Sequence, residues 1–194
     1  MLEVNFSPFP IIKTERLLLR CIEMKDAPEL LFLRGSDKTM QYIDREKLTS
    51  TAEAEALIQK ILESLNTNEG IMWCITLINK PKILIGTIGH WRLLKQHYRA
   101  EVGYMLHPDH WNKGIMKEAL LAVIDYGFNV MKLHSIEAHI NPANAASAAL
   151  LESTGFTREA YFKEDFFFNG AFIDSAIYSL LTSSSNEVKK LSLK

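Results

Sequence analysis

The stretch that decides the fold is EVGYMLHPDHWNKGIMKEA, residues 101–119. It begins as a strand that ends before Pro108, continues as a short polar loop, and becomes a helix with an unbroken apolar stripe after Gly114. The free N–H groups and the dipole of a helix N-terminus favour an anion such as phosphate. Gly114 lets the backbone approach that anion and Lys113 adds positive charge, although the loop alone is equally consistent with an ordinary strand–helix connection.

Gly103 lies inside the strand pattern, where a glycine often marks a bulge. We expect a bulge here to splay this strand from a parallel neighbour at 135–140. The opening between the two strands would expose unpaired N–H and C=O groups. Such groups suit an extended ligand arm that carries amides, as pantetheine does.

The patterns on either side alternate between strand and helix periods. Ser50 and Glu53 form a capping box, and Asn169-Gly170 is a two-residue hairpin signal. Strands are expected at 16–22, 71–78, 83–90, 100–106, 135–140, 161–168 and 171–181, and helices after Asp26, after Ser50, over 115–128 and after Asn144.

The helix between strands 100–106 and 135–140 is long enough for a right-handed crossover, which makes these strands parallel neighbours. The other strands should be antiparallel. The prediction is therefore one α/β (α+β) domain, with a mixed central sheet of about seven strands and about four helices. We expect the domain to cover 1–182, with 1–13 as an N-terminal arm and 183–194 as a flexible Ser- and Lys-rich tail.

Composition excludes several classes of function. The chain has 194 residues, of which 47% are hydrophobic, and a net charge of −1, so no general attraction to nucleic acid or to an anionic membrane is expected. No apolar run approaches the ~20 residues that span a bilayer, and the N-terminus lacks the pattern of a signal peptide. Cys21 and Cys74 are expected to be reduced, buried thiols. These features predict a cytoplasmic protein.

The run EVGYMLHPDHWNKGIMKEAL resembles the cofactor-binding motif of the GNAT acetyltransferases. It is most similar to the branch that includes the RimJ and RimL ribosomal-protein N-terminal acetyltransferases. Four further segments match that branch in kind and order, so the resemblance spans roughly 11–182: TERLLLR (14–20), ILIGTIGH (83–90), NPANAASAALLESTGF (141–156) and NGAFIDSAIYSLL (169–181). The resemblance implies an N-acetyltransferase with acetyl-CoA as co-substrate and no metal.

The resemblance also implies which residues bind the co-substrate. Backbone groups of Met105 and Leu106 should contact pantetheine, and Asn144 should reach the cofactor from the opposite side, cap its own helix, or do both. In this family the phosphate loop reads Arg or Gln, two residues, Gly, one residue, then Gly or Ala; here Trp111 and Met116 depart from that pattern. The pyrophosphate should be held by Asn112, Lys113, Gly114, Ile115 and Met116.

For proton transfer, Glu101 is the first candidate base, acting through a water molecule. A surface carboxylate is the alternative interpretation of Glu101, and His90 and Asp174 are weaker candidates. Many relatives use a tyrosine as the acid on the helix after the asparagine, whereas Ser147 occupies that turn here. A bulge N–H near Tyr104 or Met105 would polarise the thioester carbonyl.

Other functions and acceptors stay open at this stage. A catalytically silent coenzyme A-binding module and a peptide-binding module that lost the cofactor are alternatives from other classes. The acceptor amine could belong to a ribosomal protein, to another protein or peptide N-terminus, or to a small molecule such as a drug or polyamine. We expect the first two helices and the hairpin 156–172 to wall the amine site, in a monomer or a homodimer. Zinc spacing and the dinucleotide fingerprint are both absent from the sequence.

Overall fold

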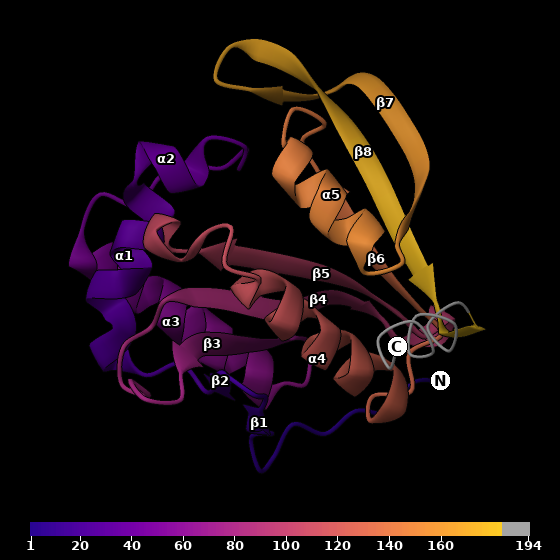
Figure 1. The fold of residues 1–194 in the computed structure, drawn as a ribbon. Coiled ribbons are helices and arrows are strands. Elements are labelled where there is room, and N and C mark those ends of the chain that lie inside the picture. The colour runs from indigo at the N-terminus through magenta and orange to yellow at the C-terminus, as the bar shows by residue number, and fades with distance from the viewer. Residues whose placement is uncertain (184–194) are drawn as a thin grey trace.

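A single mixed sheet runs through the computed structural model of the protein, which describes residues 1–183. Its strand order is β1-β2-β3-β4-β5-β6-β8-β7 (Figure 1). The strands are β1 (Ile12–Lys13), β2 (Leu17–Arg20), β3 (Ile71–Leu77), β4 (Gly86–Leu94), β5 (Arg99–Leu106), β6 (Ser135–Ile140), β7 (Thr157–Phe168) and β8 (Ala171–Leu181). The helices are α1 (Ala27–Gly35), α2 (Asp37–Met40), α3 (Thr51–Asn66), α4 (Ile115–Asn129) and α5 (Ala145–Ser153), with 3-10 turns at Met24–Asp26, Lys95–His97 and Pro108–His110.

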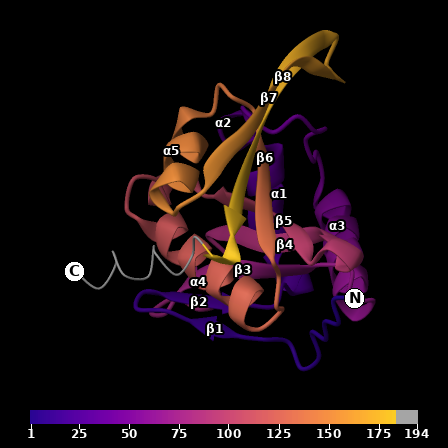
Figure 2. The same cartoon turned by 90° about the vertical axis from the view of Figure 1, so that its right-hand side faces the viewer.

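The helices form two layers around the sheet (Figure 2). On one face, α1 and α3 bury Leu30 and Ile58 in a cluster that includes Met105 of β5. On the other face, α4 and α5 bury Leu120 and Leu151 in a larger cluster with the opposite side of the sheet. Complete burial of each such side chain contributes about 1.5–3 kcal/mol. No helix within residues 1–183 has the length and apolar character needed to cross a membrane.

The mixed α/β sheet is confirmed, with two small elements added. All seven predicted strands and four predicted helices are present. The additional elements are β1, a two-residue edge strand, and α2, a single helical turn. Both are too short to produce a readable period in the sequence. The predicted tail at 183–194 falls outside the described residues from 184 onward.

The predicted N-terminal arm packs into the core. Leu2 and Phe6 are only 3% and 2% exposed. The backbone N–H of Leu2 donates to the carbonyl of Lys95 at 2.8 Å, and that of Phe6 donates to the Asn68 side chain at 2.9 Å. The segment before β1 is irregular but fixed, because its buried Leu2 and Phe6 belong to the larger core cluster.

The pair β5–β6 is the parallel pair of the described sheet, and it opens as predicted. Its register joins Arg99 to Ser135, Ala100 to Ile136 and Glu101 to Glu137, and pairing stops there although both strands continue. From that point β6 pairs only with β8. The gap between the strands therefore begins directly after Glu101.

The predicted bulge at Gly103 is wrong. Gly103 pairs in register with Gly89 of β4, and the irregularity lies in β4 between Trp91 and Leu94, where Arg92 has a φ of 45°. A Cβ on Gly103 would lie 3.5 Å from the indole of Trp91. Gly103 therefore leaves room for this ring, while the extra residue is accommodated in the partner strand.

Candidate active site

The N-terminus of α4 has a geometry that suits an anion. Gly114 is the N-cap, with a φ of 70° in the left-handed region that favours glycine, and no side chain caps the helix. By contrast, Ser50 caps α3 and Asn144 caps α5 through side-chain oxygens. The first N–H groups of α4 have no partner within the helix and point at the loop. This geometry supports the predicted phosphate loop.

Arg16, from the turn before β2, fixes this loop. Its Nε donates to Oε2 of Glu118 at 2.6 Å and its Nη1 donates to the carbonyl of Lys113 at 2.9 Å. Burial works to raise the pKa of Glu118, but hydrogen bonds from Thr14 and Arg16 outweigh it and leave that pKa below its usual value. The segment TERLLLR contains Arg16, but no local pattern indicates this contact, because Glu118 lies 102 positions later in the sequence.

Two other loop side chains donate to nearby backbone carbonyls. The Lys113 ammonium donates to the carbonyl of Asp109 at 2.6 Å. The Trp111 indole N–H donates to the carbonyl of Leu106 at 2.7 Å and thereby ties the loop to the end of β5. Trp111, which departs from the family pattern, thus anchors the loop to β5.

The backbone of β5 offers polar groups to the gap from alternate residues only. The carbonyl of Tyr98 accepts from β6, and the N–H of His107 donates toward β4. Because backbone groups alternate in direction along a strand, those of Tyr104 and Leu106 face the gap, whereas those of Met105 face β4. The backbone of Met105, expected to contact pantetheine, therefore faces β4 instead of the gap, whereas contact of Leu106 with pantetheine stays a prediction.

A pair of hydroxyls lies on the α4/α5 side of the gap. The Tyr104 hydroxyl and Ser147 Oγ are 2.7 Å apart, and either atom can be the donor. Ser147 is 8% exposed, and its N–H donates to Oδ1 of Asn144 at 3.0 Å, so Asn144 is a helix cap as expected. Burial raises the pKa of Tyr104 to about 12, against the opposite effect of its bond to Ser147. Although α5 has no tyrosine, β5 therefore places a tyrosine hydroxyl beside the serine of α5.

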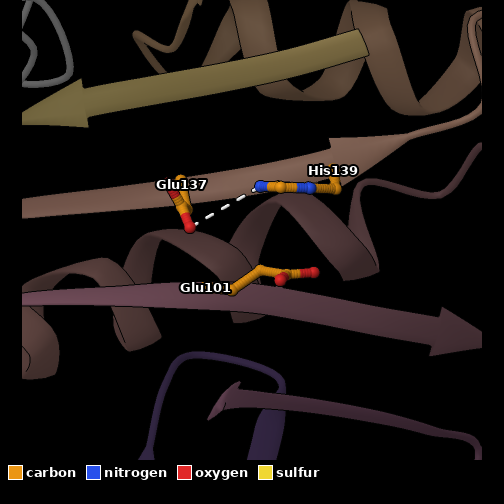
Figure 3. Close-up of side chains that lie close together, drawn as sticks. All are labelled: Glu101, Glu137 and His139. Carbon is orange, nitrogen blue, oxygen red and sulfur yellow. Dashed lines mark ion pairs between the residues drawn. The ribbon is translucent and has the colours of Figure 1, made fainter. Parts of the chain in front are cut away.

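A cluster of Glu101, Glu137 and His139 lies on the opposite side of the sheet (Figure 3). One side-chain oxygen or nitrogen from each lies within 4.8 Å of those of the other two. Oε2 of Glu101 accepts from Nη1 of Arg92 at 2.9 Å, and Oε2 of Glu137 lies 3.5 Å from Nε of Arg99. Because arginines balance both carboxylates, we assign no metal to the cluster. The sequence did not reveal it, since it depends on the register of β5 against β6.

The two weaker base candidates lie elsewhere. Burial lowers the pKa of His90 to about 4, and its Nε2 is 3.1 Å from the carbonyl of Val123 in the core. Asp174 is on the β7–β8 hairpin, where its carboxylate accepts from the Tyr161 hydroxyl and from the N–H of Glu164. Neither side chain belongs to the Glu101 cluster.

A cavity of 470 Å³ opens between the segment after α1 and the tip of the β7–β8 hairpin. The hairpin is one of the segments expected to wall the amine site, whereas the other lining residues belong to α2 and to the loop before α3, between the two helices expected to do so. Asp37 and Lys47 in its wall form an ion pair with each other. The lining residues are Asp37, Met40, Gln41, Ile43, Asp44, Arg45, Glu46, Lys47, Thr49, Phe168 and Asn169.

Comparison with known proteins agrees with this geometry. The family model described as the acetyltransferase (GNAT) domain matches residues 16–157. The chain belongs to the GNAT acetyltransferase family. An uncharacterized N-acetyltransferase of Bacillus subtilis, YoaA, is 35% identical over 173 residues, which cover 89% of this chain and 97% of the relative.

Two solved structures extend the comparison. A putative ribosomal-protein-serine acetyltransferase from Vibrio cholerae has a TM-score of 0.77 and 28% identity, covering 90% of this chain and 99% of that one. Spermidine N-acetyltransferase from Vibrio cholerae, in complex with CoA and spermine, has a TM-score of 0.79 and 27% identity, covering 89% and 99%. The chain is similar to both and lies in the RimJ/RimL-like part of the GNAT family.

As a GNAT acetyltransferase the protein uses acetyl-CoA as its acetyl donor, and its residues fit that co-substrate. The uncapped N-terminus of α4 suits the pyrophosphate, since free N–H groups and a helix dipole favour a multiply charged anion. The open strand pair, with the backbone of Tyr104 facing the gap, suits the amides of pantetheine. The co-substrate supplies an activated acetyl group, and the protein supplies orientation and proton handling.

Proposed function

We propose that this GNAT acetyltransferase transfers the acetyl group of acetyl-CoA to the α-amine of a protein or peptide N-terminus. The observation that carries the proposal is the gap between β5 and β6, which has polar side chains on both faces of the sheet. The Tyr104–Ser147 hydroxyl pair lies on one side and the Glu101–Glu137–His139 cluster on the other. An amine that enters from the carboxylate side meets the thioester, while the hydroxyl pair faces the leaving sulfur.

For the co-substrate, we propose that the loop residues Asn112, Lys113, Gly114, Ile115 and Met116 hold the pyrophosphate mainly through backbone N–H groups. Asn112 and Gly114 both have left-handed backbones, with φ values of 57° and 70°. Successive turned peptides of this kind aim their N–H groups into one concavity. Asn144 caps α5 beside the opening and contributes its amide group from the other side.

For proton transfer, we propose that Glu101 holds the attacking amine or a water molecule at the start of the gap, and that Ser147 donates to the sulfur. The reaction forms a C–N bond and breaks the C–S bond, so the amine loses a proton and the sulfur gains negative charge. A thiol with a pKa near 8.5 is a tolerable leaving group. A hydrogen bond from Ser147 therefore suffices in place of complete proton transfer.

The state of Glu101 favours an α-amine. One of its oxygens already accepts from Arg92, and its side chain is 4% exposed. A free α-amine has a pKa near 7.7–8.0 and is partly neutral at pH 7, whereas a lysine-like amine has a pKa near 10.4. A site whose carboxylate is engaged by arginine therefore suits the less basic amine. The likeness to the ribosomal-protein-serine acetyltransferase agrees with this preference.

A polyamine is the second candidate acceptor. Three carboxylates line the cavity, those of Asp37, Asp44 and Glu46, and a polyamine carries several positive charges. The relative whose structure contains spermine supports the same acceptor class. Against it, Asp37 is paired with Lys47, and Arg45 lines the same wall. We therefore rank the α-amine first.

An acceptor screen tests the proposal. Coenzyme A release from acetyl-CoA is measured with peptides that have free N-termini, with the same peptides carrying blocked N-termini, and with spermidine. Turnover with free but not blocked peptides supports the α-amine. Turnover with spermidine alone supports the polyamine. Tight binding of acetyl-CoA without turnover on any amine would identify a silent coenzyme A-binding module.

A further inference from the structure

We propose that His139, oriented by Glu137, accepts the proton that the acceptor amine loses. The inference rests on the proposed function and names a residue that the sequence patterns did not single out. Nε2 of His139 lies 3.6 Å from Oε1 of Glu137, and both side chains lie beside Glu101 where β5 and β6 part (Figure 3). The proton acceptor and the carboxylate that orients it therefore come from the same strand, two residues apart.

Glu101 alone is poorly placed to carry the proton away. Its side chain is 4% exposed, and Oε2 is engaged by Arg92 at 2.9 Å. A proton taken up on the other oxygen would neutralise the partner of Arg92 and would then have to leave a buried position. Glu101 is better suited to hold the amine or a water molecule in line with the ring of His139.

His139 has the access to solvent that Glu101 lacks. Its side chain is 35% exposed, compared with 15% for Glu137. A proton received at the cluster can therefore pass to bulk water through the imidazole. Histidine is also the side chain that exchanges protons most readily near neutral pH, which is where a general base is most efficient.

Charged groups from the neighbouring strands also contact the cluster that contains His139. From β4, Arg92 pairs with Glu101 of β5, and from β5, Arg99 pairs with Glu137. On the other side, Ser179 of β8 lies opposite Glu137 and donates to Glu159 of β7 at 2.8 Å. The carboxylate that forms an ion-pair contact with His139 is that of Glu137, at 3.6 Å.

His139, Ser147 and the solvent together account for every proton in the reaction. The amine nitrogen forms a bond to the acetyl carbon, and the bond from that carbon to sulfur breaks. The amine proton passes to His139, directly or through one water molecule, and then to solvent. The sulfur leaves as a thiolate that accepts a hydrogen bond from Ser147 and takes its proton from solvent after release.

The test compares His139→Gln, Glu137→Gln and Glu101→Gln, with His134→Gln as the matched control. His134 is an exposed histidine just before β6 and lies outside the cluster. For His139→Gln we expect kcat to fall about 10²-fold and the rise of kcat between pH 6 and 8 to disappear. Binding of acetyl-CoA, measured by calorimetry, should stay within about twofold of the wild type. The control should match the wild type throughout.

The kinetics of Glu137→Gln distinguish a role in orienting His139 from a purely structural role. Loss of the neighbouring carboxylate should lower kcat about 10-fold, while the KM for the amine and the affinity for acetyl-CoA stay near their wild-type values, because the imidazole remains but is no longer oriented. A wild-type kcat in this variant would overturn the role of Glu137.

The comparison of His139→Gln with Glu101→Gln decides which residue accepts the proton. If His139→Gln keeps the wild-type rise and Glu101→Gln loses it, Glu101 is the proton acceptor and the inference is wrong. If the wild type transfers acetyl to no amine, the proposed function fails first and the inference fails with it. If the wild type does turn over and His139→Gln keeps the wild-type pH rise, the proposed function stands and only the inference fails.

Discussion

Nε of Arg16 lies 2.6 Å from Oε2 of Glu118, which joins the turn before β2 to the first turn of α4 across 102 positions of sequence. The same guanidinium donates to the carbonyl of Lys113 in the phosphate loop. The fork of an arginine can make both bonds at once, and a lysine cannot. The shape of the loop therefore depends on a residue far from it in the sequence.

Arg16→Ala should consequently weaken acetyl-CoA binding about 10-fold, equivalent to about 1.4 kcal/mol. Arg16→Lys should restore only part of the loss. Isothermal titration calorimetry measures both, with Arg158→Ala, an exposed arginine on β7, as the control. Wild-type affinity in a folded Arg16→Ala protein would show that the loop holds its shape without this residue.

Gly114→Asp should lower acetyl-CoA affinity at least about 10-fold. The new side chain would place a negative charge at the N-terminus of α4 and strain a backbone with a φ of 70°. Gly170→Asp is the matched control, because Gly170 has a φ of 81° at the hairpin tip with nothing within 4 Å of an added Cβ. Equal affinities for the two variants would contradict the placement of the phosphate loop.

Ser147 and Tyr104 should act as one unit. Ser147→Ala should lower kcat about 10-fold, and Tyr104→Phe should lower it less, because Tyr104 acts through the serine hydroxyl. In the Ser147→Ala background, Tyr104→Phe should then have almost no further effect. Steady-state kinetics of the single and double variants measure this coupling. Additive losses would mean that the two hydroxyls act separately.

His90 should make the fold sensitive to acid. Its pKa is lowered to about 4 by burial, from an ordinary value of 6.5, so between these values the unfolded chain binds a proton that the folded protein excludes. Stability from this group is complete above pH 6.5 and is lost as pH falls toward 4. The loss amounts to about 3 kcal/mol at 1.36 kcal/mol per pKa unit.

Urea unfolding of wild type and His90→Gln between pH 7 and 4.5 measures this difference. The variant should be less stable at pH 7 but should lose less stability on acidification. His134→Gln, which changes an exposed histidine, should follow the wild-type slope. Parallel curves for wild type and His90→Gln would show that another group controls the acid sensitivity.

Local features of the fold were predictable from the sequence because they depend on residues close in the chain. The start of α4 at Gly114 follows from a strand, a polar loop and an apolar stripe. The β7–β8 hairpin follows from Asn169-Gly170, whose left-handed φ values of 47° and 81° these residue types accept readily. The opening of β5 from β6 was also foreseen, although its cause was assigned to the wrong residue.

The missed features depend on contacts between distant strands. The irregularity near Arg92 belongs to β4 and is set by how that strand meets β5, which no local pattern reports. The cluster of Glu101, Glu137 and His139 requires the parallel register of β5 and β6. Of these three residues, only Glu101 lies in the motif that resembles the family, so only Glu101 was predictable as a site residue.

Mass spectrometry with deuterium-labelled acetyl-CoA tests the central claim most directly. The protein is incubated with the labelled donor and a mixture of peptides with free N-termini, their N-terminally blocked counterparts, and spermidine. The account predicts that the label appears on the α-amine of free peptides, with stoichiometric release of coenzyme A, and that blocked peptides stay unlabelled. Binding of the donor with no label transferred to any amine would contradict it.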